Sequence, residues 1–201
     1  MLIASRSEET LQAALPELEA IAAASGGSVV HVAGSIKDED GAKMIVRTAI
    51  ETFGQLDYLV NNGGGQFEQA AADMALKGWT AVIETNLTGP WLMSTLAYNM
   101  WMRDHGGSIV VITAAPHDRQ GDPGMSHTAA ARAGADNLCK TLSVEWAASQ
   151  VRVNAVAPGS IFSETAEANY TDRADFADTS PTGPKAGKHT PARVVRHRLK
   201  I

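Results

Sequence analysis

The chain contains a single cysteine, Cys139, among its 201 residues. One thiol excludes an intramolecular disulfide framework and a cysteine-built metal site, and it indicates a reducing compartment. No apolar run approaches the roughly 20 residues that a membrane-spanning helix requires. The net charge of −5 argues against nucleic acid as the main partner.

The remaining composition is that of a globular protein. Hydrophobic residues make up 44% of the sequence and charged residues 19%, which are values of a folded domain. The length suits one domain with a buried core of its own. The first six residues lack the basic region and long apolar stretch of a signal peptide.

Strand-like and helix-like segments alternate along the chain, which predicts an α/β fold with a parallel sheet covered by helices. Helix starts and stops are marked locally: Ser5 and Glu8 form a capping box, and Gly54 ends a helical stretch that begins near Asp38. The expected strands are residues 2–4, 28–32, 56–60, 108–112 and 151–156, and the expected helices are residues 5–24, 38–53, 77–85, 87–102 and 128–148.

The character of the sequence changes after about Tyr170. Residues 171–201 contain seven basic side chains, three acidic ones and three prolines, with little apolar periodicity. We therefore expect a domain over residues 1–170 and a basic, disordered tail over residues 171–201.

One apolar stretch runs directly into paired asparagines and three glycines at residues 59–65. Backbone bared by glycine at the carboxyl end of a parallel strand is where α/β folds place nucleotide ligands. Asn61, Asn62, Gly63 and Gly64 are therefore candidate cofactor-binding residues. A plain turn is the alternative for this stretch taken alone.

Ser5 and Arg6 directly follow the first predicted strand. An acidic residue at such a position accepts a hydrogen bond from a ribose 2′-hydroxyl, whereas a basic one suits a 2′-phosphate. The two residues therefore point to NADPH. The alternative is that Ser5 only caps a helix and Arg6 is a solvated side chain.

Several sequence phrases occur together in a fixed order. They are LVNNGGG at 59–65, NLTG at 86–89, GGSIV at 106–110, LSVEW at 142–146 and RVNAVAPG at 152–159. Over about residues 2–170 they resemble the short-chain dehydrogenase/reductase family, and most closely its enoyl-CoA reductase branch. The resemblance implies a Rossmann-like doubly wound parallel sheet, NADPH, and reduction of the 2,3 double bond of trans-2-enoyl-CoA in fatty acid metabolism.

The resemblance also implies an incomplete sheet. The family orders its strands 3-2-1-4-5-6-7, and this chain begins inside the second of them. We expect the first strand with its glycine-rich turn to be missing, and the last strand as well. Loss of a central strand would leave unpaired backbone on both of its neighbours.

The family's catalytic positions are occupied by other residue types. Where the family places a tyrosine and a lysine, this sequence has Thr128 and Arg132, and the usual serine falls at Ala114. Residues four apart share a helix face, so Thr128 and Arg132 can both point at the cofactor. Asn86 matches the family's catalytic asparagine, which is thought to hold a helix kink and a proton-relay water; a simple helix junction is the alternative.

These substitutions suit a change of chemistry. Arginine stays charged and cannot relay a proton to an alkoxide, but it still donates to ribose hydroxyls. Reduction of an enoyl thioester instead places charge on the thioester oxygen, to which a hydroxyl such as that of Thr128 can donate. His127 is the candidate Cα proton donor, with His117 in the preceding loop as a weaker one.

The remaining expectations rest on the resemblance. Pro158, Gly159 and Ile161 match the loop that shapes the nicotinamide pocket, and Gly134 would permit close approach of helices in a homo-oligomer. An acyl-CoA thioester is the implied substrate, and no metal is expected. A peroxisomal location is implied, but residues 199–201 are not a Ser-Lys-Leu type signal, so a cytoplasmic location stays open.

Three other interpretations stay open. The chain can be a dienoyl-CoA reductase or a carbonyl reductase of the same fold. It can also be a catalytically inactive chain that acts only as an oligomerisation partner.

Overall fold

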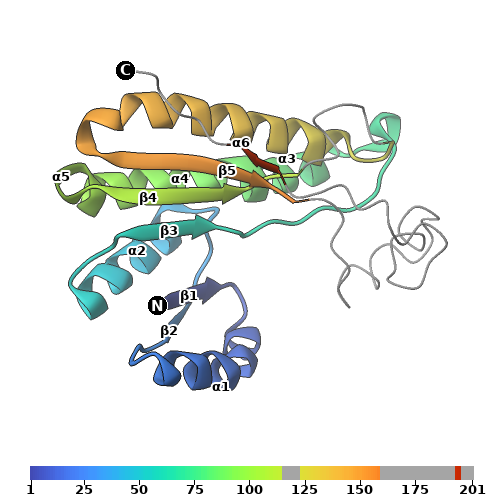
Figure 1. Ribbon diagram of the computed structural model, residues 1–201. Coiled ribbons are helices and arrows are strands. Elements are labelled where there is room, and N and C mark those ends of the chain that lie inside the picture. Colours follow the sequence, from blue (N-terminus) through green and yellow to red (C-terminus); the bar gives the residue numbers. More distant parts are fainter. Residues whose placement is uncertain (115–122, 159–192, 196–201) are drawn as a thin grey trace.

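The computed structural model describes residues 1–114, 123–158 and 193–195 (Figure 1). Its strands are β1 (Leu2–Ser5), β2 (Val30–Ala33), β3 (Tyr58–Asn61), β4 (Gly107–Ile112), β5 (Val151–Ala157) and β6 (Arg193–Val195). The longer helices are α1 (Glu8–Ala24), α2 (Glu39–Phe53), α3 (Leu76–Ile83), α4 (Gly89–Ala97) and α6 (Ser126–Glu145). Short helical segments are η1 (Ala71–Asp73), η2 (Glu84–Thr88), η3 (Tyr98–Met102), α5 (Arg103–His105) and η5 (Ala147–Ser149).

The described strands form two sheets. β1 pairs with β2, and β3, β4, β5 and β6 follow one another in the second sheet. All pairs are parallel except that β6 runs antiparallel to β5. Among the described strands, β1 and β3 are each paired on one side only. Their unpaired sides lie where the sequence predicts that the central strand of the sheet is missing. The expected α/β fold with parallel strands is confirmed.

Local signals explain where the first two helices begin. Asp38 caps α2 by accepting a hydrogen bond from the backbone N–H of Gly41 at 2.8 Å, and Gly54 ends the helix with φ 69°. The cap of α1 is Ser7, whose hydroxyl accepts from the Thr10 N–H at 3.2 Å. The predicted capping box at Ser5 is therefore wrong, because Ser5 still belongs to β1 and is extended.

One face of the second sheet is covered by helices. Leu59 on β3 packs against the buried side chains that α2, α4 and α6 bring to the core. Its neighbours along the strand, Tyr58 and Val60, point the other way and are 73% and 60% exposed. The described part of the chain thus leaves the opposite face of β3 open to solvent.

Helix α2 joins the two sheets. Its buried Ile45 and Val46 form a cluster against which Leu2 of β1, Val32 of β2 and Leu59 of β3 all pack. The β1–β2 pair is therefore attached to the rest of the fold through side chains on α2, with no strand pairing between β1 and β3 among the described residues.

Two features differ from the sequence expectations. Arg193–Val195 form strand β6 antiparallel to β5, a strand that the sequence does not predict. A Cβ on Gly134 would lie 3.1 Å from Leu87 of the same chain, so this glycine admits contact between α6 and η2 within one subunit.

None of the described helices combines the length and apolar character that a bilayer crossing requires.

Candidate active site

Polar residues gather where the strands of the second sheet end. The loop after β3, the helical segment η2 and the first turns of α6 meet beyond the carboxyl ends of β3 and β4 (Figure 1). In open parallel sheets this edge is where ligands bind. We call Asn61, Gly63–Gln66, Asn86, His127, Thr128 and Arg132 the candidate site.

Asn61 is a positioning residue at the end of β3. Its side chain is 7% exposed, and Nδ2 donates to the hydroxyl of Ser94 at 3.0 Å. Ser94 in turn donates to the Pro90 carbonyl at 2.6 Å. The contact ties the strand end to α4, and the exposed Asn62 continues into the glycine loop.

Asn86 sits inside a π-helical segment and is fully buried. A π turn shifts backbone pairing from i+4 to i+5 and leaves a carbonyl without its usual partner. The Asn86 Nδ2 donates to the Val82 carbonyl at 2.9 Å and to the Gly65 carbonyl at 2.7 Å. Its Oδ1 accepts from the Gly65 N–H at 3.3 Å. One amide thus holds the irregular helix and the glycine loop together.

The three glycines have different surroundings. A Cβ on Gly64 would collide with Nη2 of Arg132 and lie 2.9 Å from Oδ1 of Asn86, whereas one on Gly65 would meet nothing within 4 Å. A Cβ on Gly63 would lie 3.1 Å from Ile36. A side chain at Gly64 would therefore have to displace the ends of the Arg132 and Asn86 side chains, a contact that the sequence does not reveal.

Arg132 lies one helical turn after Thr128 and is half-buried. Its Nη1 donates to the carbonyl of Ile112, the last residue of β4. Burial lowers the pKa of the Arg132 guanidinium, because the charged form loses contact with water. The guanidinium is thus fixed between α6, the end of β4 and the glycine loop.

Thr128 is fully buried, and its hydroxyl donates to Oε1 of Gln66 at 3.0 Å. A hydroxyl has one proton, so in this arrangement the proton is directed at Gln66. The sequence reasoning did not single out Gln66. The available signal was its place directly after the glycines, but the partner lies 62 residues away in the chain.

His127 is also fully buried. Its Nδ1 lies 2.8 Å from the Thr128 N–H, which makes Nδ1 the acceptor and assigns the ring proton to Nε2. The ring of Phe67 packs edge-on against the imidazole, with centroids 4.6 Å apart. Nε2 has no hydrogen-bond partner among the described residues. Because His127 is fully buried, its surroundings would have to move before this nitrogen could reach a substrate.

The other predicted cofactor residues lie at separate places. Ser5 and Arg6 stand at the carboxyl end of β1, which points the same way as β3 (Figure 1), and Arg6 is exposed. Pro158 directly follows β5. Gly159, Ile161 and His117 lie outside the described residues.

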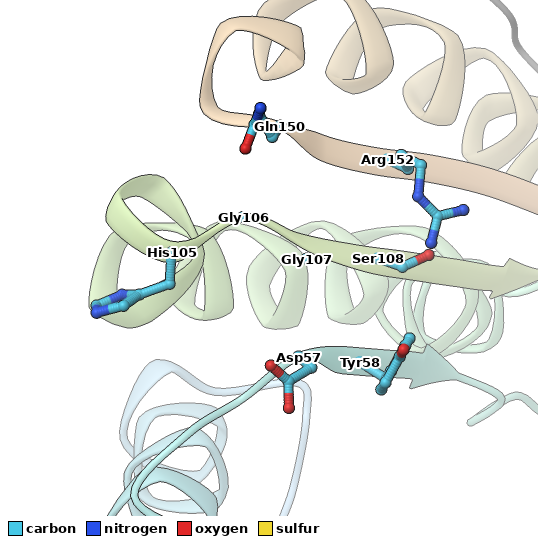
Figure 2. A pocket seen from close by; sticks show the side chains of 8 residues that line it. All are labelled: Asp57, Tyr58, His105, Gly106, Gly107, Ser108, Gln150 and Arg152. Atoms are coloured by element: carbon cyan, nitrogen blue, oxygen red, sulfur yellow. The ribbon is translucent and has the colours of Figure 1, made fainter.

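A separate hollow of about 310 Å³ lies at the opposite ends of the strands (Figure 2). It is lined by Asp57, Tyr58, His105, Gly106, Gly107, Ser108, Gln150 and Arg152. Tyr58, Ser108 and Arg152 occupy one register on neighbouring strands. Because these residues precede or begin the strands, the hollow is not part of the candidate site.

The candidate site offers donors and bared backbone to a dinucleotide. Gly65 has open space where a Cβ would stand, and Asn62 and Gly63 are exposed beside it, which suits close approach of a ribose. The described residues include no glycine-rich turn between a strand and a helix start that would hold a pyrophosphate. No group of His, Cys, Asp or Glu in the described part could hold a metal ion.

Parallel strands with a glycine loop and a polar helix face at their carboxyl ends define a Rossmann-type α/β protein. The family described as short chain dehydrogenase matches residues 1–174, and the chain belongs to this family.

Individual relatives are named for different reactions. The chain is 34% identical over 160 residues to a peroxisomal 2,4-dienoyl-CoA reductase of Danio rerio, a match that covers 80% of this chain and 52% of that protein. It is 34% identical over 144 residues to a 3-oxoacyl-acyl-carrier-protein reductase of Synechocystis, a match that covers 72% of this chain and 58% of that protein. The structure of the citronellol catabolism dehydrogenase AtuB of Pseudomonas aeruginosa is similar, with a TM-score of 0.69 and 37% sequence identity. This match covers 78% of this chain and 62% of that chain. The chain thus spans 52% to 62% of the length of these proteins.

Proposed function

We propose that this chain belongs to an NADPH-dependent oxidoreductase that reduces the 2,3 double bond of a trans-2-enoyl-CoA. It would supply the reaction side of the site, by which we mean the residues around α6 and the glycine loop that face the nicotinamide and the substrate. The observation that carries the proposal is the pair Thr128 and Arg132 on the inner face of α6, beside Asn86 and the glycine loop. A member of this family that reduces carbonyls needs a proton donor at the position of Thr128 and a proton-relaying group at the position of Arg132. Here a threonine and a fixed cation stand in their place.

The residues of the chain have distinct tasks in this proposal. NADPH, when bound, supplies a hydride. Arg6 would hold its 2′-phosphate, the glycine loop and Arg132 its ribose, and the segment from Pro158 through Gly159 and Ile161 its nicotinamide. Support comes from the exposure of Arg6 and from the open space at Gly65.

Thr128 and Gln66 form the pair that we propose for the thioester carbonyl. Their hydrogen bond shows that the hydroxyl has its proton on the side of the glycine loop. A substrate carbonyl that displaces the Gln66 oxygen would receive this proton as a hydrogen bond. Asn86 holds the loop in place, and His127 is the proposed proton donor to Cα once its surroundings have opened.

The test is NADPH oxidation with three substrates of equal chain length: a trans-2-enoyl-CoA, a 2,4-dienoyl-CoA and a 3-oxoacyl-CoA. We expect turnover of the trans-2-enoyl-CoA alone. Thr128→Val should slow it about 100-fold, because a donor to a developing oxyanion contributes roughly that much. Thr141→Val is the matched control on the same helix, where the exposed hydroxyl donates to the Asn137 carbonyl. Turnover of the 3-oxoacyl-CoA, or equal rates for both threonine variants, would contradict the proposal.

A second candidate is a catalytically inactive subunit that serves assembly. The observation in its favour is a pair of exposed apolar side chains on α4 and α6, where Trp91 is 46% exposed and Val144 is 58% exposed. We propose that these helices also mediate homo-oligomerisation of the active protein. A dimer in solution that shows no saturable NADPH binding at millimolar concentration would favour the inactive subunit.

A further inference from the structure

Arg132 brings a fixed positive charge to a half-buried position where no described carboxylate pairs with it. The ion pairs among the described residues join His31 with Glu8, Lys37 with Glu84, and Lys140 with Asp136. A charge withdrawn from water destabilises the folded state unless an opposite charge or hydrogen bonds compensate it. An unpaired guanidinium at the ligand-binding edge of a sheet therefore calls for a functional explanation.

The neighbours of the guanidinium fix its place without cancelling its charge. The Ile112 carbonyl accepts from Nη1, and Gly64 leaves room for Nη2 only because it has no Cβ. Both contacts are with neutral groups. Arginine has five N–H donors in a rigid fork, and the Ile112 carbonyl takes one of them.

The hydroxyl of Thr128 is the other donor on this helix face, and it is directed at Gln66. Thr128 can serve a substrate only after that hydrogen bond breaks. Arg132 needs no such exchange, because its remaining N–H groups are available while the contact with Ile112 is kept. The guanidinium is thus the group at this edge that already combines positive charge with spare donors.

We propose that Arg132 forms a subsite for a small oxyanion, which in catalysis is the thioester oxygen of the substrate. This assignment rests on the proposed function and adds a second task to Arg132. Addition of a hydride at Cβ breaks the 2,3 π bond, and the electron pair shifts through Cα onto the thioester oxygen as an enolate. Protonation at Cα then restores the carbonyl. A fixed cation beside that oxygen stabilises the enolate and gives up no proton of its own.

The subsite can be tested without cofactor or turnover. The probes are crotonate, its neutral isostere crotonamide, and inorganic phosphate, titrated into the full chain and followed by NMR and by thermal unfolding. We expect saturable binding of crotonate in the millimolar range, with the neutral crotonamide at least about tenfold weaker, since hydrogen bonds to charged groups are the stronger ones. Phosphate should bind no more tightly than crotonate, because the subsite is proposed to take the oxygen of an acyl group.

Variants locate the binding. Arg132→Met should weaken crotonate binding at least about tenfold, and Arg132→Lys, which keeps the charge but loses the fork, should retain part of it. Arg47→Met, which removes an exposed arginine on α2, is the control and should change nothing. If Arg132→Met does not fold, the lysine variant and the comparison of crotonate with crotonamide in the unaltered chain still decide whether Arg132 forms the subsite.

Three results would overturn the subsite. They are absence of crotonate binding, equal affinity for crotonate and crotonamide, and crotonate affinity unchanged in both Arg132 variants. Preference for phosphate over crotonate would overturn the assignment to the substrate oxygen. Crotonate binding that depends on Arg132, in a chain without enoyl-CoA turnover, would count against the proposed function alone.

Discussion

The region around α6 and the region around β1 are built in contrasting ways. At α6, Asn86 and Thr128 are fully buried, and each has a hydrogen bond to the glycine loop. At β1, Arg6 is exposed, and the strand pairs on one side only among the described residues. The comparison teaches that the reaction side of the candidate site is held by the chain's own contacts. The side proposed for the 2′-phosphate has no such support.

The largest expected effect is at Asn86. Asn86→Ala removes the donor to the Val82 and Gly65 carbonyls and the acceptor of the Gly65 N–H. We expect the free energy of unfolding to fall by about 2–4 kcal/mol, because a fully buried side chain is truncated and the buried Val82 carbonyl loses this partner. Urea unfolding measures the loss. Asn137→Ala on the exposed face of α6 is the control and should stay within about 0.5 kcal/mol.

Gly64 and Gly65, two of the three glycines of the loop, give the next effect. Gly64→Ala places a methyl group against Arg132 and Asn86, and it should cost about 1–3 kcal/mol of stability. Gly65→Ala meets open space and should cost under about 1 kcal/mol. In an Arg132→Ala background the cost of Gly64→Ala should shrink. Equal costs at both glycines would show that Gly64 is not matched to the guanidinium.

These two regions also differ in how well sequence patterns predict them. The order of strands and helices, the caps of α2 and the interruption before β3 follow from local signals and from the family resemblance. The pairing of Thr128 with Gln66 and the contact of Arg132 with Gly64 do not, because each joins segments far apart in the chain. Backbone irregularity is equally hidden, since η2 reads as ordinary helix in sequence.

A smaller effect is expected at Arg6, which lies in the exposed region around β1. Arg6→Ala should weaken NADPH binding about fivefold and leave NADH binding unchanged, because an exposed charge contact is worth about 1 kcal/mol at most. Fluorescence titration of both cofactors measures this, and the difference should shrink as salt rises. A loss of affinity for NADH of the same size would mean that Arg6 does not contact the 2′-phosphate.

The smallest effect concerns Cys139, a buried residue of α6. Burial, with a lesser contribution from the charge of Asp136, raises the pKa of the thiol to about 12. The native protein should therefore react with iodoacetamide at pH 8 only at its rate of unfolding. The thiol contributes stability that is fully present below about pH 8.5, the unfolded pKa, and is lost as pH rises toward the folded value. Rapid alkylation without denaturant would contradict this burial.

The most direct test of the contrast between the two regions uses the two halves of the cofactor separately. Reduced nicotinamide mononucleotide and 2′,5′-ADP are each titrated into the chain, and binding is followed by NMR at Thr128, Arg132 and Arg6. We predict saturable binding of the nicotinamide half, with signals of Thr128 and Arg132 shifting, and binding of 2′,5′-ADP at least about tenfold weaker. Tighter binding of 2′,5′-ADP, or no binding of the nicotinamide half, would contradict the claim that the reaction side is already formed in this chain.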